Sequence, residues 1–191
     1  MTDFNQPLDK YAKAQRIVTD EQAIQAAKQV AAFALIKRDE RDQQRQLPFA
    51  VMDLFSQTGL GGIRIPKQYG GAEVSNRTLA EVFRILSKAD ANIGLIPQNQ
   101  ISLLNIINII GNDSQKRFIF GEILSGSRLA NGGPERDTKD SKTLATTLTI
   151  ANNGYYLNGE KFYSTGSSFA DYLAIKALHP EGHVVLTIID K

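Results

Sequence analysis

Cysteine is absent from this 191-residue sequence, and histidine occurs only twice, as His179 and His183. The first absence excludes disulfide bonds, thiolate metal sites and cysteine nucleophiles, and it fits a reducing compartment. The two histidines flank Pro180, Glu181 and Gly182, a sequence typical of an exposed hairpin loop. We interpret them as solvated turn residues, because Glu181 alone does not supply the carboxylate cluster that a metal site would need with them. We therefore expect no metal.

Several motifs of common functional classes are also missing. The sequence shows no glycine-rich loop for dinucleotides or phosphates and no visible serine–histidine–aspartate arrangement, although spacing alone does not exclude a triad. The formal net charge is only +2, and basic side chains are interspersed with acidic ones, as between Lys37 and Asp42. This balance gives no argument for a nucleic acid or a membrane surface as a partner.

Long apolar runs and a leader segment are missing as well. The longest apolar segment, Ile101 to Ile110, is interrupted by polar side chains, and it is shorter than the roughly 20 residues that span a membrane. The N-terminus lacks the basic and apolar regions of a secretory signal. With 42% hydrophobic and 22% charged residues, the composition is that of an ordinary globular protein, and we expect a cytoplasmic one.

Apolar residues recur every three or four positions over residues 20–126, which predicts helices. Thr19 begins a long helix that continues through Arg45, and a single, largely buried helix covers residues 89–110. Phe118 faces inward on the last helix. The helices are predicted to begin at or near Thr19, Pro48, Ser75, Ala89 and Asp113.

The pattern changes after Gly126, where apolar and polar residues alternate as in β-strands. Turn signals occur at residues 152–154 and at Asn158-Gly159. The final strand reaches the end of the sequence without a covering element, and an open sheet edge invites association. We therefore expect the sequence to be part of a larger protein. The strands are predicted at residues 143–150, 155–157, 172–177 and 184–189.

These patterns predict an α+β chain in which helices come first and strands follow. We expect a polar arm at residues 1–19, an all-α helical domain at residues 20–126 and a partial antiparallel β-domain at residues 127–191.

Three consecutive amide side chains, Gln98, Asn99 and Gln100, lie in an otherwise apolar helix. One interpretation is that they satisfy each other or a backbone carbonyl in the interior. The other is that they line a pocket.

A second polar segment covers residues 131–137, where the chain leaves the helices, and it begins with Asn131, Gly132, Gly133 and Pro134. Glycine next to proline is typical of a simple turn. An amide followed by two glycines also suits the close approach of a bound ring or phosphate.

A third segment follows the Asn158-Gly159 turn, where two aromatic residues, Phe162 and Tyr163, precede the hydroxyls of Ser164 and Thr165. A flat heteroaromatic ring could rest on a sheet edge here and receive hydrogen bonds, so we interpret the segment as one wall of a binding site.

Three motifs occur in a characteristic order: Gly59 to Gly71, Ile110 to Gly126, and Leu157 to Lys161. The first resembles the Gly-Leu-x-Gly-Ile-x-x-Pro-x-x-Tyr-Gly-Gly loop of acyl-CoA dehydrogenases. The second is similar to their Gly-x-x-x-Gln-Lys … Leu-x-Ser-Gly helix, and the third to their Leu-Asn-Gly-x-Lys turn. The match extends over most of residues 20–191.

That resemblance implies an N-terminal helical domain, a middle β-domain and a C-terminal four-helix domain. It implies that this chain holds the first domain and part of the second, and that it lacks the C-terminal bundle. The family is homotetrameric, and the bundle supplies much of the tetramer contact.

Departures from the dehydrogenase pattern indicate a branch of the family. The Ser-Asp pair that dehydrogenases place after Thr-Glu-Pro is missing after Asn131, and their Trp-Ile-Thr-Asn is here Tyr163 to Gly166. Asn131, Thr165 and the Ile-Pro-Gln-Asn sequence at residues 96–99 look more like the flavin-dependent monooxygenases. That branch includes dibenzothiophene desulfurisation enzymes and oxidoreductases that acquire sulfur from dimethyl sulfone.

In that branch the equivalents of Asn131 and Thr165 lie near the flavin ring, so the resemblance gives these two residues the catalytic positions. Tyr163 would pack on the ring, and Gln98 and Asn99 would face the substrate. The flavin-binding set implied by the resemblance is Asn131, Gly133, Tyr163, Ser164, Thr165 and Gly166.

The resemblance therefore implies a monooxygenase of small organosulfur compounds that uses reduced FMN from a separate flavin reductase, with this chain possessing half of the apparatus. One alternative is an FAD-dependent acyl-CoA dehydrogenase. Another is a remnant without catalysis, or a fragment that binds a partner.

Overall fold

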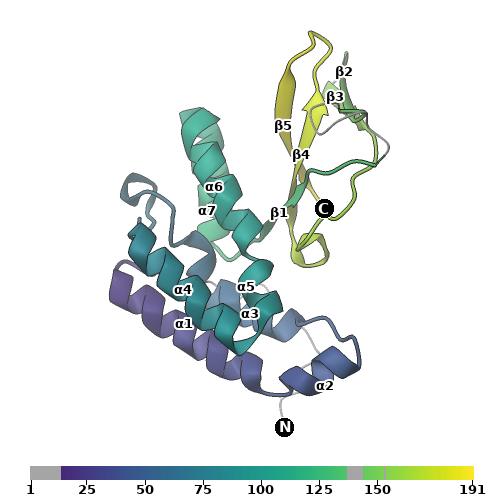
Figure 1. Cartoon of the computed structure of the whole chain (residues 1–191). Coiled ribbons are helices and arrows are strands. Elements are labelled where there is room, and N and C mark those ends of the chain that lie inside the picture. Colours follow the sequence, from purple (N-terminus) through teal and green to yellow (C-terminus); the bar gives the residue numbers. More distant parts are fainter. Residues whose placement is uncertain (1–13, 137–143, 153) are drawn as a thin grey trace. The chain divides into compact units, whose positions relative to one another are not determined.

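The computed structural model describes residues 14–136, 144–152 and 154–191, and it divides the chain between Arg128 and Leu129 into two compact units. The first unit is helical and the second contains a five-stranded sheet (Figure 1). This order confirms the predicted class, a helical part followed by a small sheet. Residues 1–13 of the predicted arm, residue 143 of the first predicted strand and residue 153 of the predicted turn lie outside the described residues.

The helical unit contains seven α-helices and two short 3-10 helices among its described residues. Helices α1 and α4 lie side by side, and α1 also packs on α3. The elements are α1 (Asp20–Leu35), α2 (Arg38–Gln43), α3 (Phe49–Gln57), η1 (Leu60–Gly62), η2 (Lys67–Tyr69), α4 (Asn76–Ala89), α5 (Ala91–Leu95), α6 (Gln98–Ile110) and α7 (Asp113–Leu124).

Side-chain caps fix where the main helices begin. At α1, the Thr19 hydroxyl accepts a hydrogen bond from the Gln22 N–H (3.2 Å), and the Gln22 side chain accepts one from the Thr19 N–H (3.3 Å). Asn112 and Gln115 form the same reciprocal capping box at α7, and the Ser75 hydroxyl caps α4. Such caps satisfy backbone donors that have no partner inside the helix. The predicted starts near Thr19 and Ser75 are confirmed.

The first helix ends earlier than the sequence pattern predicts. It stops at Leu35, Lys37 takes a left-handed conformation (φ 55°), and a separate helix, α2, follows. The buried side chain of Arg41 turns back to donate hydrogen bonds to the carbonyls of Ala34 and Ile36. These carbonyls lie at the end of α1, where no intrahelical donor remains. The tertiary contact of Arg41 therefore accompanies a break that local periodicity does not reveal.

Residues 91–110 also form two helices, α5 and α6, where the sequence predicts one. Length and composition alone would let this segment cross a membrane, with a mean hydropathy of 1.3. The core helices of globular proteins meet the same criterion, and here 44% of the window is buried inside the unit, including Leu104 and Ile107. Packing within the helical unit therefore accounts for the buried apolar residues of this segment, whereas Leu95, Ile109 and Ile110 are exposed. On α7, the prediction for Phe118 is wrong, because this side chain is 56% exposed.

The glycine-rich loop at residues 59–71 packs its backbone tightly against neighbouring helices. A Cβ at Gly62 would lie 2.8 Å from the Leu124 side chain, and one at Gly71 would collide with the carbonyl oxygen of Ile65. Only glycine allows such approaches without displacement. The loop therefore serves the packing of the helical unit.

The sheet is mixed, whereas the sequence pattern predicts antiparallel pairing. Strand β4 pairs with β5 in antiparallel fashion along its length, and β2 forms an antiparallel hairpin with β3. Strand β1 runs parallel to the beginning of β4, and β2 runs parallel to its end at Thr147 and Leu178. The elements of this unit are β1 (Leu129–Gly132), β2 (Thr147–Ala151), β3 (Gly154–Asn158), η3 (Ser167–Phe169), β4 (Tyr172–Leu178) and β5 (Val184–Asp190).

Candidate functional site

Asn131 lies on β1, opposite Ala174 of β4. Its side-chain oxygen Oδ1 is buried and has no hydrogen-bond partner among the described residues. Buried polar atoms are almost always satisfied, so an orphaned acceptor calls for an explanation, and an absent ligand or water is one. The Asn131 amide therefore offers an unused acceptor at the start of the sheet.

Two glycines, Gly132 and Gly133, follow Asn131, and they differ in the space that a side chain would have. A Cβ at Gly132 would collide with the side chain of Ile175 on β4 and lie 3.3 Å from Lys161. A Cβ at Gly133 would lie 3.6 Å from the Asn131 amide nitrogen, which is ordinary contact. Gly132 is thus required for packing, whereas Gly133 leaves space beside the amide.

The segment with Tyr163, Ser164 and Thr165 is irregular and bends sharply. Tyr163 has a φ of 54° and Gly166 a φ of 89°. The Thr165 N–H donates to the Tyr163 carbonyl (2.9 Å), and the Ser167 N–H donates to the Ser164 carbonyl (3.0 Å). A positive φ is unusual for a bulky residue and is often found at functional sites. Here it holds an aromatic side chain that is 75% exposed.

The structure brings this segment against the segment that contains Asn131. Helix η3, which follows Thr165, contacts β1. The Phe162 N–H also donates a 2.9 Å hydrogen bond to the carbonyl of Pro134. The two stretches that the sequence singles out, around Asn131 and around Thr165, are therefore neighbours in the fold.

Arg136 adds a positive charge to the same region, and the sequence did not single it out. Its guanidinium lies 4.1 Å from the centre of the Phe162 ring and 5.7 Å from that of Tyr163. Such placement over an aromatic face is favourable because the face carries partial negative charge. Arg136 itself remains exposed, so its charge is accessible to an anion.

Glu135 holds neighbouring segments of the sheet unit together, and the sequence pattern assigns it no role of its own. Its carboxylate accepts hydrogen bonds from the Lys161 ammonium (2.5 Å), from the hydroxyl and N–H of Thr146 (2.5 and 3.0 Å) and from the Ala145 N–H (2.5 Å). Burial raises the pKa of Glu135, but these hydrogen bonds together lower it more, to about 2. Glu135 is therefore ionised and rigidly held, which suits a structural role.

The three amides of α6 behave differently from one another. Gln100 is buried and donates a 3.0 Å hydrogen bond to the Gly61 carbonyl. That contact matches the interpretation of an internally satisfied amide. Gln98 is exposed and Asn99 is half-buried. Both belong to the helical unit, whereas Asn131 and Thr165 belong to the sheet unit, so the substrate role of Gln98 and Asn99 stays a prediction.

Comparisons with known proteins point to one family. The family model described as "Acyl-CoA dehydrogenase, N-terminal domain" matches residues 18–127. A 3-(aryl)acrylate reductase of Clostridium sporogenes is 30% identical over 142 residues, which are 73% of this chain and 38% of the reductase. A dibenzothiophene monooxygenase of Mycolicibacterium goodii is 25% identical over 126 residues, which are 65% of this chain and 30% of that enzyme.

A solved structure shows the same fold. The FMN-bound TdsC of Paenibacillus sp. A11-2 superposes with a TM-score of 0.77 at 24% identity, over 88% of this chain and 44% of TdsC. The chain thus spans less than half the length of each of these three proteins.

Proposed function

The chain belongs to the acyl-CoA dehydrogenase family, and from that membership we propose that its sheet unit contributes one wall of a flavin site in an oxidoreductase. Within the family we propose the reduced-FMN-dependent monooxygenase branch, with small organosulfur compounds as substrates. The relatives include a monooxygenase and a reductase, so the branch is inferred from the residues of the site.

The observation that carries the proposal is the buried, unpartnered Oδ1 of Asn131. An isoalloxazine ring presents N–H groups along its edge, and an orphaned amide oxygen is a suitable acceptor for one of them. A reduced flavin supplies the electrons with which oxygen is activated. Asn131 would orient the ring edge, and the Thr165 hydroxyl, two residues beyond the strained Tyr163, would donate or accept a second hydrogen bond there.

Neighbouring side chains suit other parts of the same ligand. The exposed Tyr163 ring offers a flat apolar face, and aromatic faces stack at low entropic cost. The small residues Gly133, Ser164 and Gly166 would leave room for the ligand next to these side chains. Arg136, held over Phe162, has the charge that an FMN phosphate requires.

A second candidate is an FAD-dependent dehydrogenase of acyl-CoA substrates. The greater identity to an acyl-CoA dehydrogenase of Bacillus subtilis, 30% against 25% for the monooxygenase, favours it. The two candidates differ in flavin preference and in substrate. A flavin reductase as partner belongs only to the monooxygenase proposal, because that enzyme must receive its flavin already reduced.

Titration of the purified chain with FMN and with FAD, followed by quenching of flavin fluorescence, separates these candidates. Because this chain supplies only one wall of the site, the monooxygenase proposal expects weak flavin binding by the chain alone, with FMN bound at least as tightly as FAD. Preference for FAD, together with a further change on adding acyl-CoA, would favour the dehydrogenase. Tight stoichiometric binding of either flavin would contradict the view that this chain supplies only part of the site.

A further inference from the structure

The loop between β4 and β5 is a tight hairpin closed by His179 and His183. The His179 N–H donates to the His183 carbonyl, and the Gly182 N–H donates to the His179 carbonyl, both at 2.8 Å. Gly182 takes a φ of 86°, the left-handed position that such hairpin loops require. This backbone holds the two imidazole rings in a stack, with centroids 4.4 Å apart and planes inclined by 23°.

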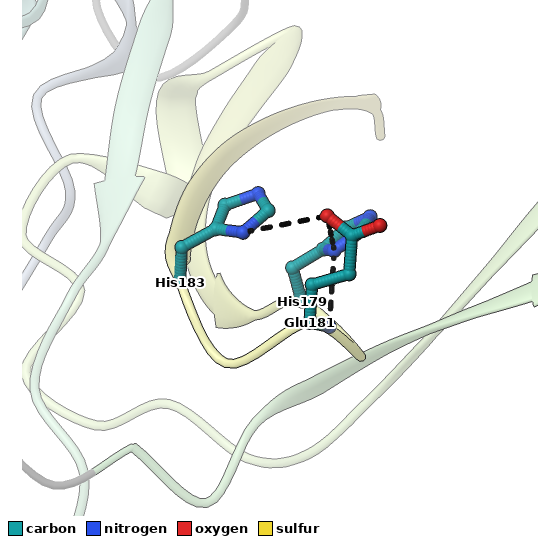
Figure 2. A group of neighbouring side chains, drawn as sticks. All are labelled: His179, Glu181 and His183. Carbon is teal, nitrogen blue, oxygen red and sulfur yellow. Dashed lines mark hydrogen bonds and ion pairs between the residues drawn. The ribbon is translucent and has the colours of Figure 1, made fainter.

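Glu181, at the tip of the loop, faces both rings (Figure 2). Its Oε2 lies 3.8 Å from Nδ1 of His179 and 3.9 Å from Nδ1 of His183. One candidate ligand atom from each of the three residues lies within 4.8 Å of the others. Two ligands of one tetrahedral zinc ion are about 3.4 Å apart, given metal–ligand distances near 2.1 Å. Binding of one ion requires the two rings to rotate out of their stack, so that a nitrogen of each faces the ion together with the carboxylate.

We propose that His179, Glu181 and His183 form a binding site for a divalent transition-metal ion, with water in the remaining positions. Two imidazoles and one carboxylate favour Zn²⁺, Ni²⁺ or Cu²⁺ over the harder Mg²⁺ and Ca²⁺, which prefer all-oxygen ligands. The sequence argued against a metal because only one carboxylate stands near the histidines. The fold changes that judgement, since the hairpin brings two imidazoles and this carboxylate close together.

Two features set the expected strength of the site. The Glu181 N–H donates a 3.3 Å hydrogen bond to Nδ1 of His179, and ligation through that nitrogen replaces this bond with hydration of the N–H, which weakens metal binding. Glu181 and His183 are also well exposed, so solvent screens their charges. We expect an accessible site of modest affinity that remains open to further ligands.

The composition of the chain allows metal binding at this hairpin to be tested without competing imidazole or thiolate sites. The chain contains no cysteine and no other histidine, so imidazole-dependent metal binding has no second source. The untagged 191-residue chain is titrated with Zn²⁺ in competition with a chromophoric chelator. One ion is expected per chain. The single variants His179→Gln and His183→Gln should each weaken binding about tenfold or more, and Glu181→Gln should weaken it by a smaller factor.

Glu160→Gln serves as the matched control, because Glu160 is an exposed carboxylate elsewhere in the same unit. It should leave the affinity unchanged. A second measurement needs no variant: substoichiometric Cu²⁺ should broaden the NMR signals of both imidazoles together in the wild-type chain. Absence of saturable Zn²⁺ binding, equal affinity in the double histidine variant, or broadening of only one imidazole would each overturn the proposal.

Discussion

Lys161 and Glu135 form a buried ion pair, with 2.5 Å between Nζ and Oε1 and side chains that are only 8% and 4% exposed. Glu135 follows β1, which contains Asn131, and Lys161 follows β3 and precedes Thr165, so the pair ties these two parts of the sheet unit together. The two charges neutralise each other, and the N–H and hydroxyl of Thr146 donate further hydrogen bonds to the carboxylate. The positions of the candidate flavin contacts therefore depend on this pair.

Replacing Lys161 with methionine should strongly destabilise the sheet unit. The change leaves Glu135 buried without its counter-charge, and removal of one partner of a buried pair costs about 3–5 kcal/mol in the free energy of unfolding. Urea denaturation monitored by circular dichroism measures this loss. The double variant Glu135→Gln/Lys161→Met should lose less than the sum of the two single variants, because the residues are coupled. Strict additivity would show that the pair contributes no interaction of its own.

Stability should fall in acid because of Glu135. Its pKa of about 2 in the folded chain lies below the ordinary value of 4.5, so its stabilising contribution is complete above about pH 4.5 and disappears as the pH falls toward 2. The shift corresponds to about 3 kcal/mol of unfolding free energy. Denaturation curves of wild type and Glu135→Gln between pH 5 and about pH 2 should converge as the pH falls. A difference that stays constant over this range would contradict the assignment.

Two glycine-to-alanine substitutions in the helical unit should have opposite effects. At Gly71 a Cβ would lie 2.6 Å from Ile65 backbone and side-chain atoms, and such overpacking costs about 1–3 kcal/mol. At Gly121, an exposed position within α7, a Cβ meets nothing within 4 Å. Alanine there should stabilise the chain by about 0.5–1 kcal/mol through its higher helix propensity. Thermal denaturation of both variants checks the pair, and destabilisation by Gly121→Ala would contradict the described packing.

Features that depend on neighbours in the sequence could be predicted, and these include the helix starts. Thr19 and Ser75 act through backbone groups three residues away, so their caps are visible in the sequence. The break after Leu35 could not be predicted, because it involves Arg41, which also reaches Asp90 across 49 positions. Strand β1 was missed for a similar reason, since its partner β4 begins at Tyr172, far along the chain.

The candidate site was predictable to the extent that its residues form local motifs. Asn131 and Thr165 were found through short motifs with family resemblance, and their segments do meet in the sheet unit. Glu135 and Arg136 stand in a segment that the sequence singled out through Asn131 and its glycines, without a role for either charged residue. Their partners, Lys161 and Phe162, are about 26 residues away, so only the tertiary fold shows their roles. The sequence argued against metal binding by His179 and His183 because it shows only one nearby carboxylate. Their proximity to Glu181 depends on the backbone geometry of the hairpin, which the sequence does not show.

Asn131 is the residue on which the flavin proposal rests, and its replacement gives the most direct measurement. FMN fluorescence quenching is compared for the wild type, for Asn131→Leu, and for Asn158→Leu as a control at an exposed asparagine of the same unit. Loss of one buried hydrogen bond to a ligand costs about 1–3 kcal/mol, so Asn131→Leu should weaken FMN binding by about tenfold or more. The control should bind FMN as the wild type does. Equal FMN affinity in Asn131→Leu and wild type, with the fold of both intact by circular dichroism, would contradict the claim that this amide contacts a flavin.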